Sequence, residues 1–265
     1  MDEDASARER AAYLGKKTRA YLVHVYTAGG VAFAFLAAAE IASGGSAAGT
    51  SVPNDTPDPQ WVFLWLLIAG VIDATDGPLA RRWNVKVRAP RIGGDVIDDI
   101  VDYLTFTFLP LLLVWRMGWL PAPVGLWVCV AMVVSLLGFA NIAAKQTEGG
   151  FFRGFPSYWN IVAFYIGLLA ENYPWGEMAS LVVLLVLSVL TLAPVRFLYP
   201  NRTEPPWRAV VIWGAVGWTV LLLVMLMTYP NLPGWATGWL LPLSLGYPAF
   251  YFGLSFYLDV RSRGT

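Results

Sequence analysis

Six aspartates fall within thirty positions of this chain, between two long apolar runs. They are Asp73, Asp76, Asp95, Asp98, Asp99 and Asp102. The apolar runs extend from Trp61 to Val71 and from Tyr103 to Trp115. An ionised carboxylate in apolar surroundings costs several kcal/mol unless a cation, a basic side chain or a proton compensates its charge. Few basic residues lie close in sequence, so we expect a cation from outside the chain.

The spacing of these residues predicts two helical stripes that face each other. The first stripe holds Asp73, Asp76, Gly77, Ala80 and Arg81, and the second holds Gly94, Asp98 and Asp102. Residues three or four apart share one face of a helix. Two facing pairs of carboxylates can bind one or two hard divalent ions through oxygen ligands. The small residues beside them would let a phosphate-bearing ligand approach the backbone closely.

These eight residues, in this order, resemble the signature of the CDP-alcohol phosphatidyltransferases, integral membrane enzymes of phospholipid synthesis. Every fixed position of that signature is matched. The insert between Arg81 and Gly94 is longer than in most of the family and resembles that of the bacterial phosphatidylcholine synthases. The segments 24–29 and 151–160 are similar to that subfamily too. The resemblance therefore spans about residues 18–200.

The resemblance implies a reaction and a division of roles. The phosphatidyl group of CDP-diacylglycerol would be transferred to choline, with release of CMP. Two divalent metal ions, either Mg²⁺ or Mn²⁺, would be bound by Asp73, Asp76, Asp98 and Asp102. Asp98 and Asp102 would be catalytic, with Asp102 also the general base for the choline hydroxyl. The CDP-binding residues would be Thr27, Gly77, Ala80, Arg81 and Gly94.

Several residues near this signature have two interpretations. Asp95 and Asp99 form a rival pair of carboxylates, but Arg91 stands where a small residue should precede them, so we expect them to support the metal ligands or face the headgroup region. His24 is the only histidine of the chain, and it either lines the site or is a structural group. The basic linker 82–93 either lies on anionic lipid or forms a lid over the nucleotide.

The sequence also offers candidates for the acceptor and the lipid phosphate. A quaternary ammonium cannot donate conventional hydrogen bonds, so proteins bind it with aromatic faces and nearby carboxylates. The segment 145–160 is rich in aromatic residues, which either bind choline or anchor the chain at the membrane interface. The candidates are His24, Glu148, Phe152, Arg153, Trp159 and Arg196.

Composition predicts an all-α polytopic membrane protein. Of the 265 residues, 57% are hydrophobic and only 14% are charged. Apolar runs predict eight transmembrane helices, at 20–43, 61–81, 94–115, 123–144, 158–170, 178–198, 209–228 and 239–258. The formal net charge is zero, which gives no reason to expect a nucleic-acid partner.

Basic residues predict the orientation in the membrane. Under the eight-span scheme every Lys and Arg except Arg116 lies in, or at the ends of, segments on one side. The positive-inside rule then places both termini and the aspartates at the cytoplasmic side of a bacterial inner membrane. We expect a cytoplasmic segment at 1–19, a transmembrane domain at 20–258 and a cytoplasmic tail at 259–265. Within the first segment, residues 6–19 form either a short amphipathic helix on the membrane surface or a disordered tail.

Other functions compete with this one. The same chemistry could serve another acceptor, such as serine, inositol or glycerol phosphate. From a different class, a cation transporter would also carry intramembrane aspartates. A transporter would not explain the spacing of Gly77, Ala80, Arg81 and Gly94. The repeat signals that are typical of transporters are also missing from the sequence. The sequence leaves open the choice between a monomer and a homodimer.

Overall fold

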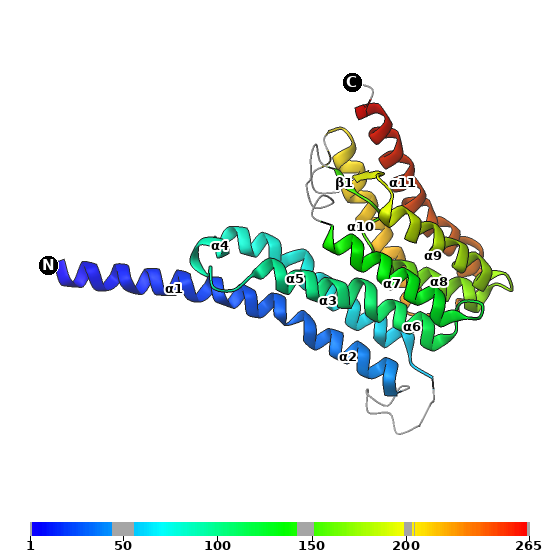
Figure 1. Cartoon of the computed structure of the whole chain (residues 1–265), viewed down its shortest axis with the longest axis horizontal. Helices are drawn as coiled ribbons and strands as arrows, with labels where there is room; N and C mark the ends of the chain where they lie inside the picture. The colour runs from blue at the N-terminus through cyan, green and yellow to red at the C-terminus, as the bar shows by residue number, and fades with distance from the viewer. Residues whose placement is uncertain (1, 44–55, 142–150, 199–202, 204, 264–265) are drawn as a thin grey trace.

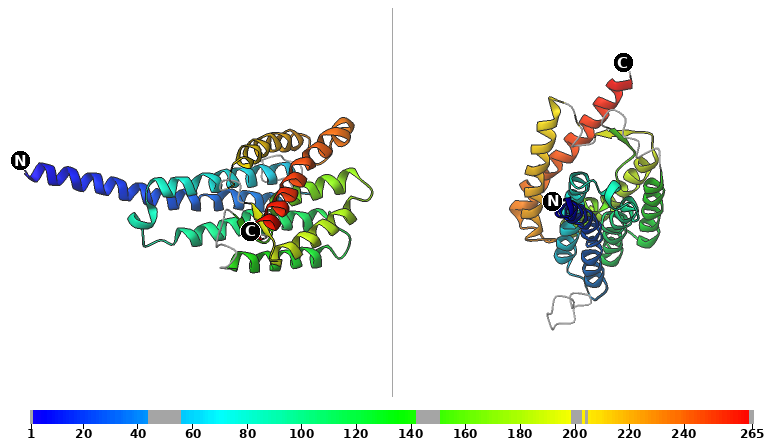
Figure 2. Two further views of the ribbon diagram at one scale, coloured as in Figure 1. Left: turned by 90° about the horizontal axis from the view of Figure 1, so that it is seen from above. Right: turned by 90° about the vertical axis from the view of Figure 1, so that its left-hand side faces the viewer.

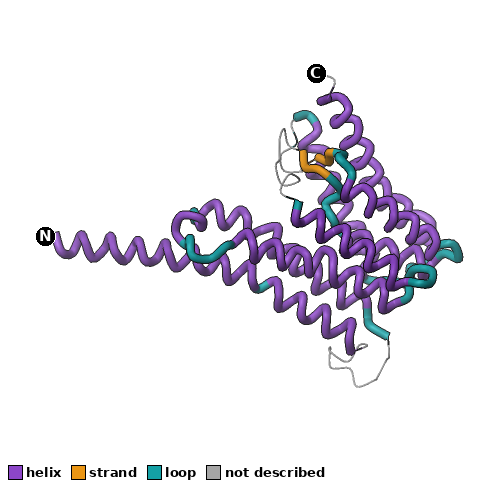
Figure 3. The backbone as a smooth tube through the Cα atoms, viewed as in Figure 1, coloured by secondary structure: helices purple, strands orange, loops and turns teal. Residues whose placement is uncertain are grey.

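The computed structural model describes residues 2–43, 56–141, 151–198, 203 and 205–263. Within these residues the chain is helical apart from loops and one short antiparallel ribbon (Figure 3). The expected all-α class is therefore confirmed. A helix lies in every range where a membrane span is expected, while the number of spans stays a prediction.

The elements form a bundle in which α1, α3 and α5 run along its long axis, and α10 and α11 lie against one side (Figures 1 and 2). The helices are α1 (Asp2–Ala28), α2 (Gly30–Ser43), α3 (Pro59–Arg82), α4 (Val85–Arg88), α5 (Gly94–Asp102), the π-helix η1 (Tyr103–Phe108), α6 (Leu109–Met117), α7 (Val124–Ala140), α8 (Trp159–Asn172), α9 (Gly176–Leu192), α10 (Trp207–Leu226), the π-helix η3 (Ala236–Leu240) and α11 (Leu241–Arg263). The strands are β1 (Phe151–Arg153) and β2 (Arg196–Leu198).

Apolar side chains cover both the inside and the outside of the bundle. Leu111, Trp119 and Leu184 are almost completely buried, whereas Trp213 and Met227 are 73% and 79% exposed. Within the described residues, three segments are long and apolar enough to cross a membrane, namely Arg10–Ser43, Pro59–Arg82 and Trp207–Leu226. Helices that are apolar on all sides suit hydrocarbon surroundings, so the fold is that of a membrane protein.

The first two helices make one long rod that is interrupted only at Gly29. A Cβ at this position would lie 2.9 Å from the carbonyl oxygen of Tyr26, so a larger residue would force the two halves apart. Of the two alternatives for residues 6–19, the structure has a helix, which continues directly into the apolar part of α1. The rod extends beyond the rest of the bundle at its N-terminal end (Figure 1).

The end of α9 corrects one expected boundary. The sixth span was expected to reach Leu198, yet α9 ends at Leu192. Pro194 explains the difference, because a proline disfavours the helical conformation of the residue before it. Ala193 accordingly has an extended ψ of 144°. The chain beyond it forms β2, which pairs antiparallel with β1.

Side-chain contacts fasten this ribbon to the C-terminal helix. Arg196 of β2 forms a 2.5 Å ion pair with Asp259 of α11, and its guanidinium lies over the ring of Phe151 at 5.3 Å. Tyr251 of α11 donates a 2.6 Å hydrogen bond to the carbonyl of Leu198. The ribbon therefore connects the loop before α8 with the end of the chain.

We expect Asp259→Asn to lower the free energy of unfolding by about 2 kcal/mol, because it leaves a mostly buried guanidinium without its full counter-charge. Thermal unfolding of the purified protein in detergent measures this loss. Lys86→Ala is the matched control, because the Lys86–Asp95 pair is largely exposed and exposed pairs contribute little. Equal melting temperatures for Asp259→Asn and the unsubstituted protein would contradict the proposed role of the ion pair.

Candidate active site

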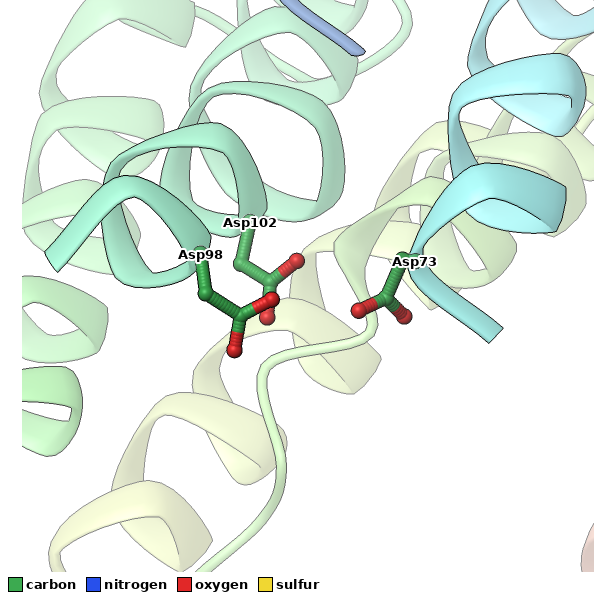
Figure 4. Close-up of side chains that lie close together, drawn as sticks. All are labelled: Asp73, Asp98 and Asp102. Atoms are coloured by element: carbon green, nitrogen blue, oxygen red, sulfur yellow. The ribbon is translucent and has the colours of Figure 1, made fainter. Parts of the chain in front are cut away.

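Three carboxylates from two neighbouring helices converge on one point. Asp73 projects from α3 toward Asp98 and Asp102 on α5, as Figure 4 shows. One ligand oxygen from each residue lies within 4.8 Å of the others. Asp98 and Asp102 are one helical turn apart, so both face α3 at the same time. The predicted stripes do meet in this structure.

The three carboxylates have no basic partner in the described parts of the chain, since none of them forms an ion pair with Lys or Arg. Carboxyl oxygens of Asp73 and Asp102 lie within 4.8 Å of each other. Like charges this close require a shared proton or a cation. An all-oxygen donor set is the kind that hard divalent ions prefer, so the cluster fits such an ion.

Asp76 takes a different position from the other predicted ligands. It lies one turn further along α3, is only 6% exposed and lines a neighbouring cavity. The oxygens of the converging group do not include Asp76. Asp98 of the converging group lines the same cavity, so the cavity adjoins the three carboxylates directly.

The cavity has a volume of about 560 Å³ and lies between α1, α3, the 82–93 linker and the start of α5. Its lining includes most residues that the family signature assigns to the CDP moiety, together with the only histidine. These are His24, Thr27, Gly77, Ala80, Arg81 and Gly94. The structure thus brings together residues that are up to seventy positions apart in sequence.

Gly94 has a packing role that the sequence did not indicate. A Cβ at this position would lie 2.8 Å from Cε1 and 3.1 Å from Nδ1 of His24. The glycine therefore allows the imidazole ring to pack directly against the backbone of α5. At Gly77 a Cβ would lie 3.4 Å from Nη1 of Arg81, so this glycine leaves room for the guanidinium.

His24 has an unused hydrogen-bonding atom in the cavity wall. The side chain is 6% exposed, and its Nε2 atom has no hydrogen-bond partner among the described residues. Buried polar atoms are nearly always paired, and an unpaired one costs about 1–3 kcal/mol. The neighbouring Thr27 donates to the carbonyl of Val23 within α1. His24 is thus the polar group of α1 with bonding capacity to spare for a ligand.

The linker forms one wall of the cavity. Its short helix α4 packs Val85 and Ala89 against Ala20 and Val23 of α1. Seven residues of the linker and its helix line the cavity, namely Asn84, Val85, Lys86, Val87, Pro90, Ile92 and Gly93. This helical turn was not predicted from the sequence, although the spacing of the apolar residues Val85 and Ala89, four positions apart, is typical of a helix.

The rival carboxylates lie outside the converging group. Asp95 is exposed and forms a 3.2 Å ion pair with Lys86 of α4. Neither Asp95 nor Asp99 belongs to the set of oxygens that could bind one ion. This arrangement agrees with the expectation that the two support the ligands, and their roles stay a prediction.

Of the described candidates for the acceptor and lipid phosphate, His24 lines the cavity, whereas Arg153, Trp159 and Arg196 do not. Trp159 is completely buried and donates a 2.6 Å hydrogen bond to Ser135, so its ring packs in the core. Phe152 and Arg153 lie in β1, and Arg196 is paired with Asp259. Glu148 falls outside the described residues. Sequence spacing alone could not show whether these residues lie in the site, because their positions depend on tertiary packing.

Comparison with known proteins identifies the family. The model of the CDP-alcohol phosphatidyltransferase family matches residues 31–246, which is most of the chain. The chain belongs to this family. Its matched region contains all eight residues of the signature, whereas His24 and Thr27 precede it.

Relatives of this CDP-alcohol phosphatidyltransferase include several bacterial proteins. It is 38% identical to the phosphatidylcholine synthase of Pseudomonas aeruginosa over 71% of this chain and 72% of the relative. It is 37% identical to that of Bradyrhizobium diazoefficiens over 79% and 72%, and 34% identical to that of Legionella bozemanae over 75% and 91%, respectively. No solved structure matches the chain.

We expect Mn²⁺ or Mg²⁺ to raise the melting temperature of the protein, because an ion that binds only the folded state stabilises it, by about 2.7 kcal/mol at a hundredfold excess over Kd. Asp98→Asn should remove most of this rise, since it deletes one of three converging ligands. Glu177→Gln, at an exposed acidic residue of α9, is the control and should keep the full rise. A metal-dependent rise of unchanged size in Asp98→Asn would refute the metal site.

Proposed function

We propose that this protein is a phosphatidylcholine synthase. It transfers the phosphatidyl group of CDP-diacylglycerol to choline and releases CMP. The observation that supports this most strongly is the convergence of Asp73, Asp98 and Asp102 beside the cavity lined by the family's CDP-binding positions. The relatives named as phosphatidylcholine synthases favour choline over other acceptors.

The converging carboxylates hold the metal and activate the acceptor. Asp73, Asp98 and Asp102, with Asp76 beside them, would bind two divalent ions, Mg²⁺ or Mn²⁺. Bound there, such ions polarise phosphoryl oxygens and neutralise negative charge on the leaving CMP. Asp102 accepts the proton of the choline hydroxyl, because a carboxylate in apolar surroundings holds a proton more readily than one in water.

The reaction balances with these groups alone. The choline oxygen forms a bond to the phosphorus that carries the diacylglycerol. The bond from that phosphorus to the bridging diphosphate oxygen breaks, and the electron pair leaves with CMP. The hydroxyl proton passes to Asp102. The products are phosphatidylcholine and CMP.

The cavity positions the nucleotide. Gly77 and Ala80 leave room on α3, and the guanidinium of Arg81 is placed to pair with diphosphate oxygens. The unpaired Nε2 of His24 offers one hydrogen bond to the CDP moiety from α1. The wall formed by α4 excludes water from one side of the diphosphate.

The site lies on the cytoplasmic side of the bacterial inner membrane in this proposal. The distribution of Lys and Arg supports this orientation. The helix α4 and the start of α5, which line the cavity, lie toward the end of the bundle from which the N-terminal part of α1 extends (Figure 1). That part of α1 carries several basic residues.

Incubation of the purified protein with CDP-diacylglycerol and a panel of labelled alcohols tests the proposal. We expect CMP release and a labelled phospholipid with choline, and neither product with serine, inositol or glycerol phosphate. Chelation of divalent metal should abolish both. Asp102→Asn should reduce kcat at least a hundredfold, as loss of a general base does. Glu177→Gln serves as control.

Two results would refute this assignment. Transfer to serine, inositol or glycerol phosphate but not to choline would keep the family and exclude the acceptor. Cation flux into proteoliposomes without any nucleotide, and no CMP release, would favour a transporter instead.

We expect His24→Ala to raise KM for CDP-diacylglycerol about tenfold, which corresponds to one hydrogen bond of about 1.4 kcal/mol. His24→Gln should recover part of the loss, because its amide can hydrogen-bond from a similar position. Val25→Ala, at a neighbouring side chain that is 66% exposed, is the matched control. An unchanged KM in His24→Ala would show that the imidazole does not contact the nucleotide.

A further inference from the structure

The contact between α3 and the helix that carries Asp102 continues one turn beyond the carboxylates. Asp73 faces Asp102, and three residues earlier on α3 Gly70 faces Phe106 of η1. A Cβ at Gly70 would lie 3.9 Å from Cζ of Phe106. The side chain of Phe106 therefore points toward α3, as that of Asp102 does. Phe106 lies one helical turn beyond Asp102, about 5 Å along the helix axis.

A second aromatic ring stands beside Phe106. The ring centroid of Tyr158 is 5.9 Å from that of Phe106, with 58° between the ring planes. Tyr158 is 42% exposed and Phe106 is partly buried, so a small ligand can reach both rings. The two rings come from η1 and from the start of α8, so sequence spacing could not associate them.

The backbone around Tyr158 is held in place on both sides. Ser157 is buried and has a φ of 56°, a left-handed conformation that is uncommon for a residue other than glycine. Trp159 is anchored in the core through Ser135. Before them, Phe155 donates its backbone N–H to the carbonyl of Leu190. Local strain of this kind persists where the surrounding structure imposes it, and it is concentrated at functional sites.

We propose that Phe106 and Tyr158 form the subsite for the quaternary ammonium of the acceptor alcohol, a proposal that rests on the function proposed above. A cation is attracted to an aromatic face within about 6 Å of the ring centroid. An ammonium seated against the outer surface of this ring pair, beside both rings, needs no hydrogen-bond donor or acceptor from the protein. The short ethanol arm of choline then directs its hydroxyl toward Asp102.

This subsite also selects against phosphorylated acceptors. Neither ring supplies the positive charge that would pair with a phosphate group on the acceptor. The subsite therefore replaces Phe152 and Trp159 as the aromatic group for choline.

The test compares choline with dimethylbutanol, the neutral analogue in which a carbon atom replaces the quaternary nitrogen. Phe106→Leu and Tyr158→Leu should each raise KM for choline about tenfold and leave KM for CDP-diacylglycerol unchanged. KM for dimethylbutanol should change less than threefold, because only the charged acceptor loses the attraction to the ring. Tyr158→Phe keeps the aromatic face and should stay within about twofold of the unsubstituted enzyme.

Phe108→Leu is the matched control, because Phe108 lies in the same π-helix and its side chain is 37% exposed. It should leave all three constants unchanged. An unchanged choline KM in both leucine variants, or an equal loss for choline and dimethylbutanol, would refute the subsite while leaving the proposed function intact. If the unsubstituted protein releases CMP with another alcohol but not with choline, the proposed function fails, and the subsite with it.

Discussion

The structure depends on the repulsion between carboxylates that α3 and α5 direct at each other. Asp73, Asp98 and Asp102 lie close together in apolar surroundings and have no ion pair to Lys or Arg within the described residues. Such an arrangement is costly unless positive charge is bound between the helices. A divalent ion satisfies that requirement and is also what transfer of a phosphoryl group needs, so stability and chemistry require the same ligand.

The surrounding helices hold α3 and α5 in position. The close approach of His24 to Gly94 sets the distance between α1 and α5, and α4 rests on α1 through Val85 and Ala89. The cavity is thus bounded by segments that also fix the separation of α3 and α5. The ribbon of β1 and β2, which the Arg196–Asp259 ion pair fastens to α11, positions the loop before α8.

Much of this organisation was predictable from the sequence. Apolar runs indicated the helices, because a segment that spans hydrocarbon must be apolar along its length. The spacing of Asp73, Asp98 and Asp102 indicated a shared site, because helical periodicity fixes which residues share a face. Contacts between distant segments were not predictable. The core position of Trp159, the pairing of Arg196 and the approach of Tyr158 to Phe106 all depend on how α8 and β2 pack against other elements.

Among the described residues, those that line the cavity all lie between Val23 and Asp98, in the first half of the chain. Tyr158, in contrast, belongs to the second half of the chain, and its ring contacts Phe106 of η1, which belongs to the first half. In the proposed assignment, the residues that contact the nucleotide and the tyrosine that contacts the alcohol therefore belong to separate stretches of the polypeptide. Evolution, or a protein engineer, can retune the loop before α8 for a different headgroup without rebuilding the part that handles the activated lipid.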